Sequence, residues 1–247
     1  MTDALGYRRK FGVLAPSTNT IVEPDFYAMA PHGVTFHFGR IYISAQTMTN
    51  DAEAENVLVQ LRESIQQTVR SVMTCEPDYM IMGMSSETFW GGKQGNEEFT
   101  QRIKEWSGLD VATGADAANR ALTLFGAKRI GVVTPYQPVF DEQVRRFFGE
   151  CGFEVAALVG LKCPTAVAIA QVPEDTLRQS ILEVNTPDVD AVVQVGTNLS
   201  MVRLADEAER WLKKPVIAIN AAIFWHALRS NSIDDQMCGF GSLLREH

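Results

Sequence analysis

The stretch from Asp78 to Gly92, DYMIMGMSSETFWGG, carries the signal that decides the fold. Its first part, Tyr79 to Met82, is a short apolar run that ends at Gly83, which is typical of a strand buried inside a sheet. Two hydroxyl residues, Ser85 and Ser86, follow in what we expect to be a polar loop. In open α/β sheets, ligands bind beyond the carboxyl ends of the strands. The stretch therefore predicts a small-molecule site beside the serine pair.

The same pattern occurs twice in the chain. The segment FGVLAP (11–16) is matched by IGVVTP (130–135), and DYMIMGMSS (78–86) is matched by DAVVQVGTN (190–198). Two halves with the same β-α-β order are the simpler interpretation, although parallel strands of α/β proteins resemble one another in any case. We therefore expect an α/β fold with two pseudo-symmetric halves, each a parallel sheet flanked by helices. The first half comprises residues 1–118 and 222–247, the second comprises residues 119–221, and the site lies in the cleft between them.

Further elements follow from periodicity and from glycine and proline positions. Additional strands are predicted at 34–43, 155–161 and 214–220. Helices are predicted at 51–73, 96–106, 114–125, 140–149, 174–184 and 221–228. Gly126 is expected to end the third of these helices, and the chain from residue 237 onward is expected to be a tail.

Composition excludes several classes of protein. The chain has 247 residues, is 46% hydrophobic and 21% charged, and carries a net charge of −8. That charge argues against a nucleic-acid partner, because phosphate binding requires clustered Lys and Arg. No apolar stretch reaches the roughly 18 residues of a membrane span, and the N-terminal residues lack the apolar core of a signal peptide. These features predict a soluble, cytoplasmic protein without a membrane or nucleic-acid partner, and a homo-oligomer is possible.

Metal and nucleotide chemistry have no support in the motifs. The four cysteines and four histidines are scattered without metal-ligand spacing, and no HExxH, GxxxxGK[ST] or GxGxxG motif occurs. A disulfide framework is not expected in a chain of this size. We expect no metal site.

Four loops, in this order, carry a family resemblance: PSTNT (16–20), GMSSETFWGG (83–92), TPY (134–136) and GTNL (196–199). They resemble the Asp/Glu racemase superfamily, and within it the branch of maleate cis-trans isomerase and arylmalonate decarboxylase. The resemblance extends over nearly the whole chain. It implies two pseudo-symmetric α/β halves and an enzyme that uses no cofactor.

The chain departs from this family at the catalytic cysteines. Racemases and isomerases of the superfamily use one cysteine from each half, and the decarboxylase keeps only the second. The resemblance places these positions at Met84 and Gly196, so both family cysteines are missing. A methionine cannot transfer a proton, whereas a glycine leaves space for a substituent or a water molecule. This asymmetry predicts a one-sided reaction.

Other family roles are implied for residues that are present. Ser85, Ser86 and Tyr136 match the hydroxyl groups that hold a substrate carboxylate, and Asn19 matches the asparagine of the first loop. Each has a structural alternative: a helix N-cap for the serines, loop packing for Tyr136, and turn stabilisation for Asn19. Thr197 and Asn198 are expected to open the helix after Gly196 and to form a second anion cradle with it.

Three residues are candidates for the chemistry: Glu87, Tyr136 and Cys163. A partly buried Glu87 could act as a general acid or base, but a first-turn glutamate that interacts with the helix dipole is the simpler reading. Cys163 could be a relocated nucleophile, or a small buried apolar residue. Arg40 and Arg203 could pair with a second acid group.

The sequence thus predicts a cofactor-independent enzyme that acts on a small (di)carboxylic acid by isomerase- or decarboxylase-type chemistry. Two alternatives remain open at this point. One is a hydrolase of an amide or enamine acid that uses activated water. The other is a binding protein for small acids that has lost catalysis.

Overall fold

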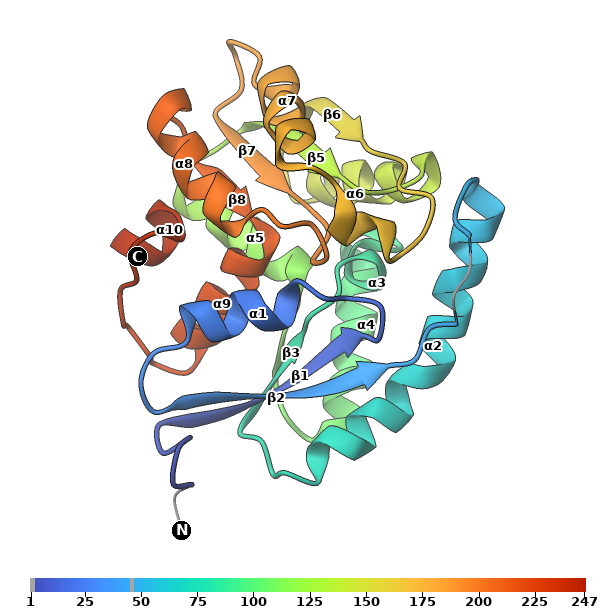
Figure 1. Ribbon diagram of the computed structural model, residues 1–247, viewed down its shortest axis with the longest axis vertical. Coiled ribbons are helices and arrows are strands. Elements are labelled where there is room, and N and C mark those ends of the chain that lie inside the picture. Colours follow the sequence, from blue (N-terminus) through green and yellow to red (C-terminus); the bar gives the residue numbers. More distant parts are fainter. Residues whose placement is uncertain (1–2, 45–46) are drawn as a thin grey trace.

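The computed structural model describes residues 3–44 and 47–247, and it contains two four-stranded, all-parallel sheets (Figure 1). The first sheet has the order β2-β1-β3-β4 and the second has the order β6-β5-β7-β8. The two orders are equivalent, which confirms the predicted α/β fold with two similar halves. The strands are β1 (Arg9–Pro16), β2 (Val34–Ile41), β3 (Tyr79–Met82), β4 (Val111–Ala112), β5 (Arg129–Thr134), β6 (Glu154–Gly160), β7 (Ala191–Gln194) and β8 (Val216–Ala218).

The internal repeat extends to individual hydrogen bonds. At the end of β3, Gly83 N–H donates to the carbonyl of Leu14 at 2.8 Å, and at the end of β7, Val195 N–H donates to the carbonyl of Val133 at 2.9 Å. Leu14 and Val133 are equivalent by the sequence repeat, so Gly83 and Val195 are equivalent as well. The residues that follow them, Met84 and Gly196, therefore occupy matching places beyond the two central strands.

Helices cover both faces of each sheet (Figure 1). Two of the predicted helices have the predicted bounds, α2 (Asp51–Met73) and α7 (Glu174–Val184). The Asn50 side chain caps α2 by accepting from Glu53 N–H, and Gly126 follows α5 in the left-handed conformation as expected. The other helices are α1 (Val22–Met29), α3 (Ser86–Phe89), α4 (Gly92–Ser107), α5 (Gly114–Leu124), α6 (Pro138–Glu150), α8 (Val202–Leu212), α9 (Ile219–Ser230), α10 (Ser242–Glu246) and the short 3₁₀ helix η1 (Ala168–Gln171).

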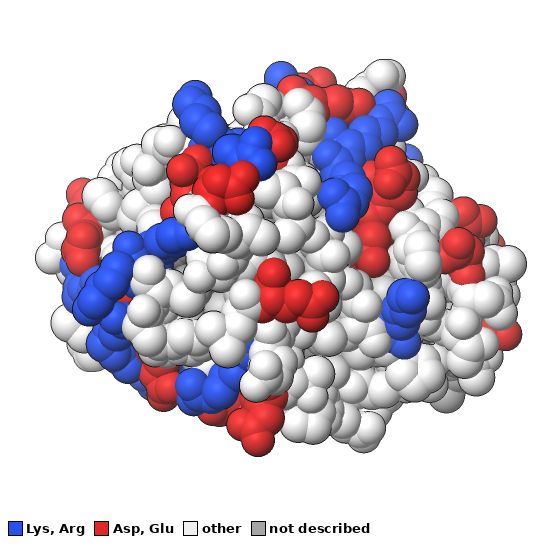
Figure 2. Space-filling view, turned by 90° about the horizontal axis from the view of Figure 1, so that it is seen from above, with Lys and Arg blue, Asp and Glu red and all other residues white. Residues whose placement is uncertain are grey.

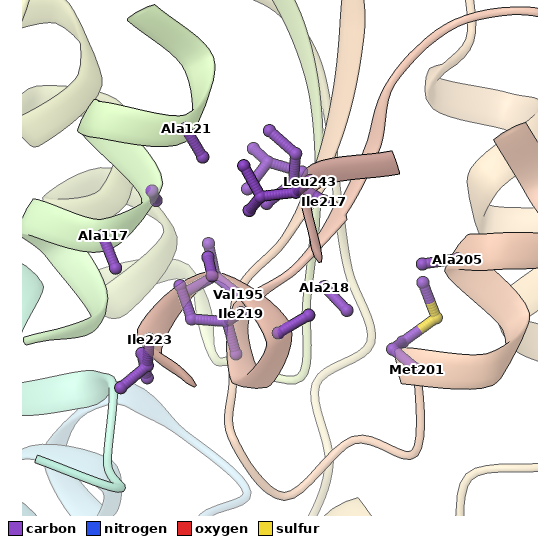
Figure 3. Close-up of a cluster of buried hydrophobic side chains, with 14 of the residues drawn as sticks. Ala117, Ala121, Val195, Met201, Ala205, Ile217, Ala218, Ile219, Ile223 and Leu243 are labelled. Carbon is purple, nitrogen blue, oxygen red and sulfur yellow. The ribbon is translucent and has the colours of Figure 1, made fainter. Parts of the chain in front are cut away.

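The main apolar core runs through both halves. It contains Phe11 and Ile81 of the first sheet together with Val132 and Val192 of the second. Figure 3 shows the part where small side chains of α5 face the side chains of α9 and β8. Alanines at these positions of α5, such as Ala117, allow the two helices to approach closely. Helix α5 also runs without a break across the expected boundary between residues 118 and 119.

Several short elements, α3 and η1 among them, were not predicted from the sequence. Helix α1 and the two-residue strand β4 were not predicted, because both are short and α1 contains Pro24 in its first turn. The expected tail is also wrong in part, since it contains α10. In α10, Leu243 and Leu244 are buried, and the carbonyl of Leu244 accepts from Met237 N–H at 2.9 Å. Across the described ranges, no helix has the length and apolar character that a membrane span needs.

Burial of α10 gives the first test. Leu244 is fully buried, so Leu244→Ala should lower the free energy of unfolding by about 2–5 kcal/mol, as expected for a leucine removed from a core. Leu124, at the end of α5, is 45% exposed and serves as the matched control, with an expected change within about 0.5 kcal/mol for Leu124→Ala. Urea denaturation measures both values. Equal effects of the two substitutions would contradict the docking of α10.

Candidate functional site

A cavity of about 90 Å³ lies beyond the carboxyl ends of β1, β3, β5 and β7, where loops of both halves meet. This is the place that the sequence predicted for a ligand. The cavity has a polar wall formed by loop residues and an apolar wall formed largely by α2. Its lining residues are Pro16, Thr18, Asn19, Ile43, Met48, Ala54, Val57, Leu58, Leu61, Met84, Ser85, Ser86, Pro135, Tyr136, Gln137, Phe140, Cys163, Ala166, Ile169, Gly196, Thr197 and Asn198.

The serine pair provides hydrogen-bond donors that the protein itself does not use. Ser85 occupies the N-cap position of α3, as the structural alternative predicts, but its side chain makes no cap hydrogen bond. Its Oγ atom is buried and makes no well-formed hydrogen bond with a described residue, although it lies close enough to the Tyr136 hydroxyl to lower the pKa of that group. The backbone N–H groups of Ser86 and Glu87 also donate to no described protein acceptor. Buried polar groups are normally satisfied, so this cluster of free donors is suited to an anionic oxygen.

Tyr136 lies on the same wall and packs against Phe140, with ring centroids 5.6 Å apart. Burial raises the pKa of the Tyr136 hydroxyl, and the nearby Ser85 hydroxyl offsets part of this effect. The phenol is therefore protonated at neutral pH and able to donate.

Asn19, Thr197 and Asn198 connect the two halves beneath the cavity. Asn19 Nδ2 donates to Thr197 Oγ1 at 3.0 Å, and Thr197 Oγ1 donates to the carbonyl of Gly83 at 3.0 Å. The Oδ1 atom of Asn198 accepts from Thr20 N–H at 3.0 Å. These side chains line the cavity, but much of their hydrogen-bonding capacity is used within the protein.

The helix that was expected to begin at Thr197 does not begin there. Helix α8 begins at Val202, and residues 197 and 198 form a turn instead. The side chains of Thr197 and Asn198 hold this turn against the loop after β1, which prevents the helix from starting directly after Gly196. The predicted cradle at a helix N-terminus is therefore wrong, although both residues are at the site.

The apolar wall was not predicted from the sequence. Helix α2 contributes Ala54, Val57, Leu58 and Leu61, and α6 contributes Phe140. The periodicity of α2 predicted an apolar face. Periodicity alone does not distinguish a face that packs in the core from a face that lines a cavity. Gln137 was also missed. It donates from Nε2 to the carbonyl of Met48, which joins the two halves at the rim of the cavity.

No Asp, Glu, Lys, Arg or His lines the cavity within residues 3–44 and 47–247. Its ionisable side chains are Tyr136 and Cys163. Burial raises the pKa of the Cys163 thiol to about 11. Both groups therefore carry their protons at neutral pH, and the cavity provides donors without a fixed charge.

Glu87 lies outside the lining of the cavity. Its buried carboxylate accepts from Arg62 Nε at 2.8 and 2.9 Å, and Arg102 is 3.3 Å away. Burial raises the pKa of Glu87, while the two arginines partly oppose the shift. The contacts tie α3 to α2 and α4, so Glu87 supports the serine loop from behind.

Neither arginine that was considered for a second acid group reaches the cavity lining. Arg40 donates to the carbonyl of Asn19 at 3.0 Å and lies 3.6 Å from Glu23. Arg203 donates to the carbonyl of Gly239 and lies over the ring of Phe240.

Two further expectations concern ions and nucleic acids. Among the described residues, no group of three or more His, Cys, Asp or Glu side chains is placed to hold a metal ion. On the face seen in Figure 2, acidic and basic side chains are interspersed, and no continuous basic patch is formed.

Met84 and Gly196 both line the cavity, but they differ in the room they leave for a side chain. Met84 is buried and fills its place. Gly196 has a φ of +112°, and a Cβ atom added there would lie 2.6 Å from Pro135 Cδ. A cysteine at position 196 would therefore require both a strained backbone and a shift of Pro135.

Comparisons of the sequence and of the structure with known proteins point to the same family. The model of the arylmalonate decarboxylase family matches residues 11–244. A maleate isomerase of Pseudomonas putida is 26% identical over 248 residues, covering 95% of this chain and 96% of the relative. An arylmalonate decarboxylase of Bordetella bronchiseptica is 27% identical over 151 residues, covering 60% of this chain and 62% of the relative.

A similar solved structure is that of a maleate cis-trans isomerase from Nocardia farcinica. It is a cysteine-to-serine variant with a covalently bound succinylcysteine intermediate. The TM-score is 0.87 at 22% identity, and the alignment covers 97% of this chain and 99% of the other. This likeness supports the fold with two similar halves.

The backbone at Gly196 can be tested by adding one methyl group. Gly196→Ala should cost about 1–3 kcal/mol of stability from backbone strain, and the collision with Pro135 should add to this cost. Gly108 is the control, because it has a φ of +72° and no atom within 4 Å of an added Cβ. Gly108→Ala isolates the backbone cost, and Gly196→Ala should exceed it by at least about 1 kcal/mol in chemical denaturation. A smaller effect at position 196 would show that the loop relaxes and could accept a cysteine.

Proposed function

Because the chain belongs to the arylmalonate decarboxylase family, we propose that it is an enzyme that decarboxylates a small malonate-type acid with an apolar substituent. The observation that carries this proposal is the division of the cavity into two walls. One wall consists of neutral hydrogen-bond donors and the other of aliphatic and aromatic side chains, with no charged residue among the described lining. Such a cavity suits a ligand with one carboxylate and an apolar remainder.

In this proposal the retained carboxylate lies against Ser85, Ser86 and Tyr136. The free Oγ of Ser85 and the free N–H groups of Ser86 and Glu87 support this placement. Donors fixed in a site without bulk water stabilise an enediolate more than the carboxylate from which it forms, since negative charge on the oxygens grows during the reaction. The neutral Tyr136 hydroxyl adds one more donor.

The departing carboxylate lies against the apolar wall. Val57, Leu58 and Leu61 cannot hydrogen-bond to it, so its charge is poorly solvated there. Loss of CO2 removes this charge from the apolar surface. The C–C bond breaks, and its electron pair remains on the enediolate held by the donor wall.

The enediolate carbon then needs a proton. The cavity-lining groups able to supply one are the Cys163 thiol and the Tyr136 hydroxyl, since both are protonated at neutral pH. Cys163 is the stronger acid of the two and is our preferred donor, and its thiolate recovers the proton from solvent. This role as an acid differs from nucleophilic attack, which requires a thiolate.

The one-sided chemistry also follows from the two positions that family cysteines occupy. We assign these positions to Met84 and Gly196, which lie at equivalent places beyond β3 and β7. Without a thiol at either place, isomerisation through a covalent thiol adduct has no nucleophile there. We therefore favour decarboxylation over isomerisation, with no cofactor in the reaction.

The site in this proposal lies between the two halves assigned as residues 1–118 with 222–247, and residues 119–221. Asn19, Thr197 and Asn198 fix the halves relative to each other and contribute amide and hydroxyl groups to the polar wall. Gly196 does not leave the space expected from the sequence, because Pro135 lies where its Cβ atom would be. The hydrolase alternative requires a carboxylate that activates water in the cavity. Glu87 does not fill this role, because it is paired with Arg62 and Arg102 away from the cavity.

The carboxylate assignment is tested with phenylmalonate as the probe. Ser85→Ala, which removes the buried Oγ, should reduce kcat/KM by roughly fivefold to 150-fold, which corresponds to the 1–3 kcal/mol of a hydrogen bond to a charged group. Ser71→Ala, on the exposed face of α2, is the matched control and should leave kcat/KM unchanged. Release of CO2 and formation of phenylacetate measure the turnover.

Other results would replace the proposal. Equal activity of the Ser85→Ala and Ser71→Ala variants would remove the Ser85 hydroxyl from the carboxylate site. Incorporation of oxygen-18 from solvent into the product of an amide acid would indicate hydrolysis instead. Thermal stabilisation by several acids, none of which is converted, would indicate a binding protein.

A further inference from the structure

The loop that carries Tyr136 rests on a buried carboxylate that the proposed reaction does not use. Asp141 lies in the first turn of α6, below the cavity, and is 9% exposed. It is not part of the cavity lining. A buried carboxylate is costly to keep, so its contacts indicate what it does.

The first contact leads to Tyr136. The hydroxyl of Thr134, the last residue of β5, donates to Asp141 Oδ1. The same Thr134 Oγ1 accepts from Tyr136 N–H at 3.2 Å. A hydroxyl with its proton directed to a carboxylate presents its lone pairs to the amide, so Asp141 fixes the direction of both hydrogen bonds. The peptide at the base of Tyr136 is thus held by a relay that ends on Asp141.

The second contact leads to Cys163. A Cβ atom at Gly160 would lie 2.0 Å from Asp141 Oδ2, so the carboxylate packs directly against the end of β6. The segment that follows β6 is bonded to the Tyr136 loop: Lys162 N–H donates to the carbonyl of Tyr136, and Cys163 N–H donates to that of Pro135 at 2.9 Å. One carboxylate therefore contacts the bases of both segments that carry ionisable groups to the cavity.

The charges around Asp141 come from several elements. Arg145 of its own helix and Lys162 of the loop after β6 favour the ionised form. Asp51, at the start of α2, opposes it, and the Tyr136 hydroxyl lies within the field of Asp141. Glu87 belongs to α3, which packs against α6, but its carboxylate is paired with Arg62 of α2 and Arg102 of α4.

From this geometry we infer that Asp141 is a positioning residue, which sets the orientation of Tyr136 through Thr134 and changes it when the carboxyl group gains a proton. Burial raises the pKa of Asp141 to about 6. Protonation near that pH removes the negative acceptor from the Thr134 hydroxyl and weakens the relay. The site is in its working arrangement above this pH and is disturbed below it. The functional part of this inference rests on the decarboxylase proposal, but the coupling to Tyr136 does not.

The coupling is measured on the full chain labelled with 3-fluorotyrosine. The chain has five tyrosines, and the ¹⁹F resonance of Tyr136 is assigned by its loss in Tyr136→Phe. Between pH 4.5 and 8, this resonance should shift with a midpoint near 6 in the wild-type chain. Asp141→Asn, which keeps the size and one acceptor oxygen, should abolish the step.

Two further pairs of variants make the test specific. Asp116 is the matched control, because burial also raises its pKa, but it bonds to Thr113 and Asn96, neither of which lines the cavity. Asp116→Asn should leave the Tyr136 step in place. Thr134→Val should reduce the step to the part caused by the direct field of Asp141, and Thr134→Ser should restore its full size, which tests the relay even if Asp141→Asn does not fold.

Activity provides the second readout. With phenylmalonate, the acid limb of kcat/KM near pH 6 should be lost in Asp141→Asn and kept in Asp116→Asn. If the wild-type chain does not convert phenylmalonate, only the function proposed for this substrate is affected, and the ¹⁹F titration still decides the coupling. A Tyr136 resonance that does not titrate in the wild-type chain, a step that survives in Asp141→Asn, or a step that keeps its full size in Thr134→Val would overturn the inference.

Discussion

The site depends on one buried hydrogen-bond relay between the two halves. Asn19 Nδ2 donates to Thr197 Oγ1, which donates to the carbonyl of Gly83. These three residues follow β1, β7 and β3, so the relay fixes the relative positions of three strand ends from both sheets. Asn220 adds a further bond from its Nδ2 to the carbonyl of Thr197 at 3.0 Å. A cavity formed by loops has a defined shape only if such contacts hold the loops, because loops gain conformational entropy when they are released.

Much of the fold could be predicted from the sequence, because the elements concerned are defined by local sequence patterns. The apolar run Tyr79–Met82 and the long amphipathic helix Asp51–Met73 were predicted with their observed bounds, since periodicity and flanking glycines are strong signals. The internal repeat predicted two similar halves, and the two sheets have equivalent strand orders. Helices α1 and α10 were missed because they are short and gain most of their stability from tertiary packing, which a local pattern does not record.

The sequence predicted where the candidate site lies better than it predicted what the residues of the site do. Ser85, Ser86, Tyr136 and Cys163 were selected from the sequence, and all four line the cavity. The expected helix at Thr197 was wrong, because contacts with residues nearly 180 positions away in the chain hold that segment as a turn. The partners of Glu87 also lie on two other helices. Neighbours that are distant in sequence thus decided what these side chains do.

The central physical feature of the site is a set of free donors without a fixed positive charge. A charged arginine would bind a carboxylate more strongly, but it would stabilise the acid before the reaction as much as the product. Neutral donors that strengthen as charge develops favour the enediolate instead. The buried Ser85 Oγ, which has no partner among the described residues, marks where this effect should be largest.

The most direct measurement is a crystal structure of the chain with phenylacetate, the product that the proposed reaction would release from phenylmalonate. The account predicts a carboxylate oxygen at about 3 Å from Ser85 Oγ, with the phenyl ring inside the cavity against Phe140 of the apolar wall. A carboxylate bound instead to the exposed arginines, such as Arg62 or Arg102, with the ring outside the cavity, would contradict it.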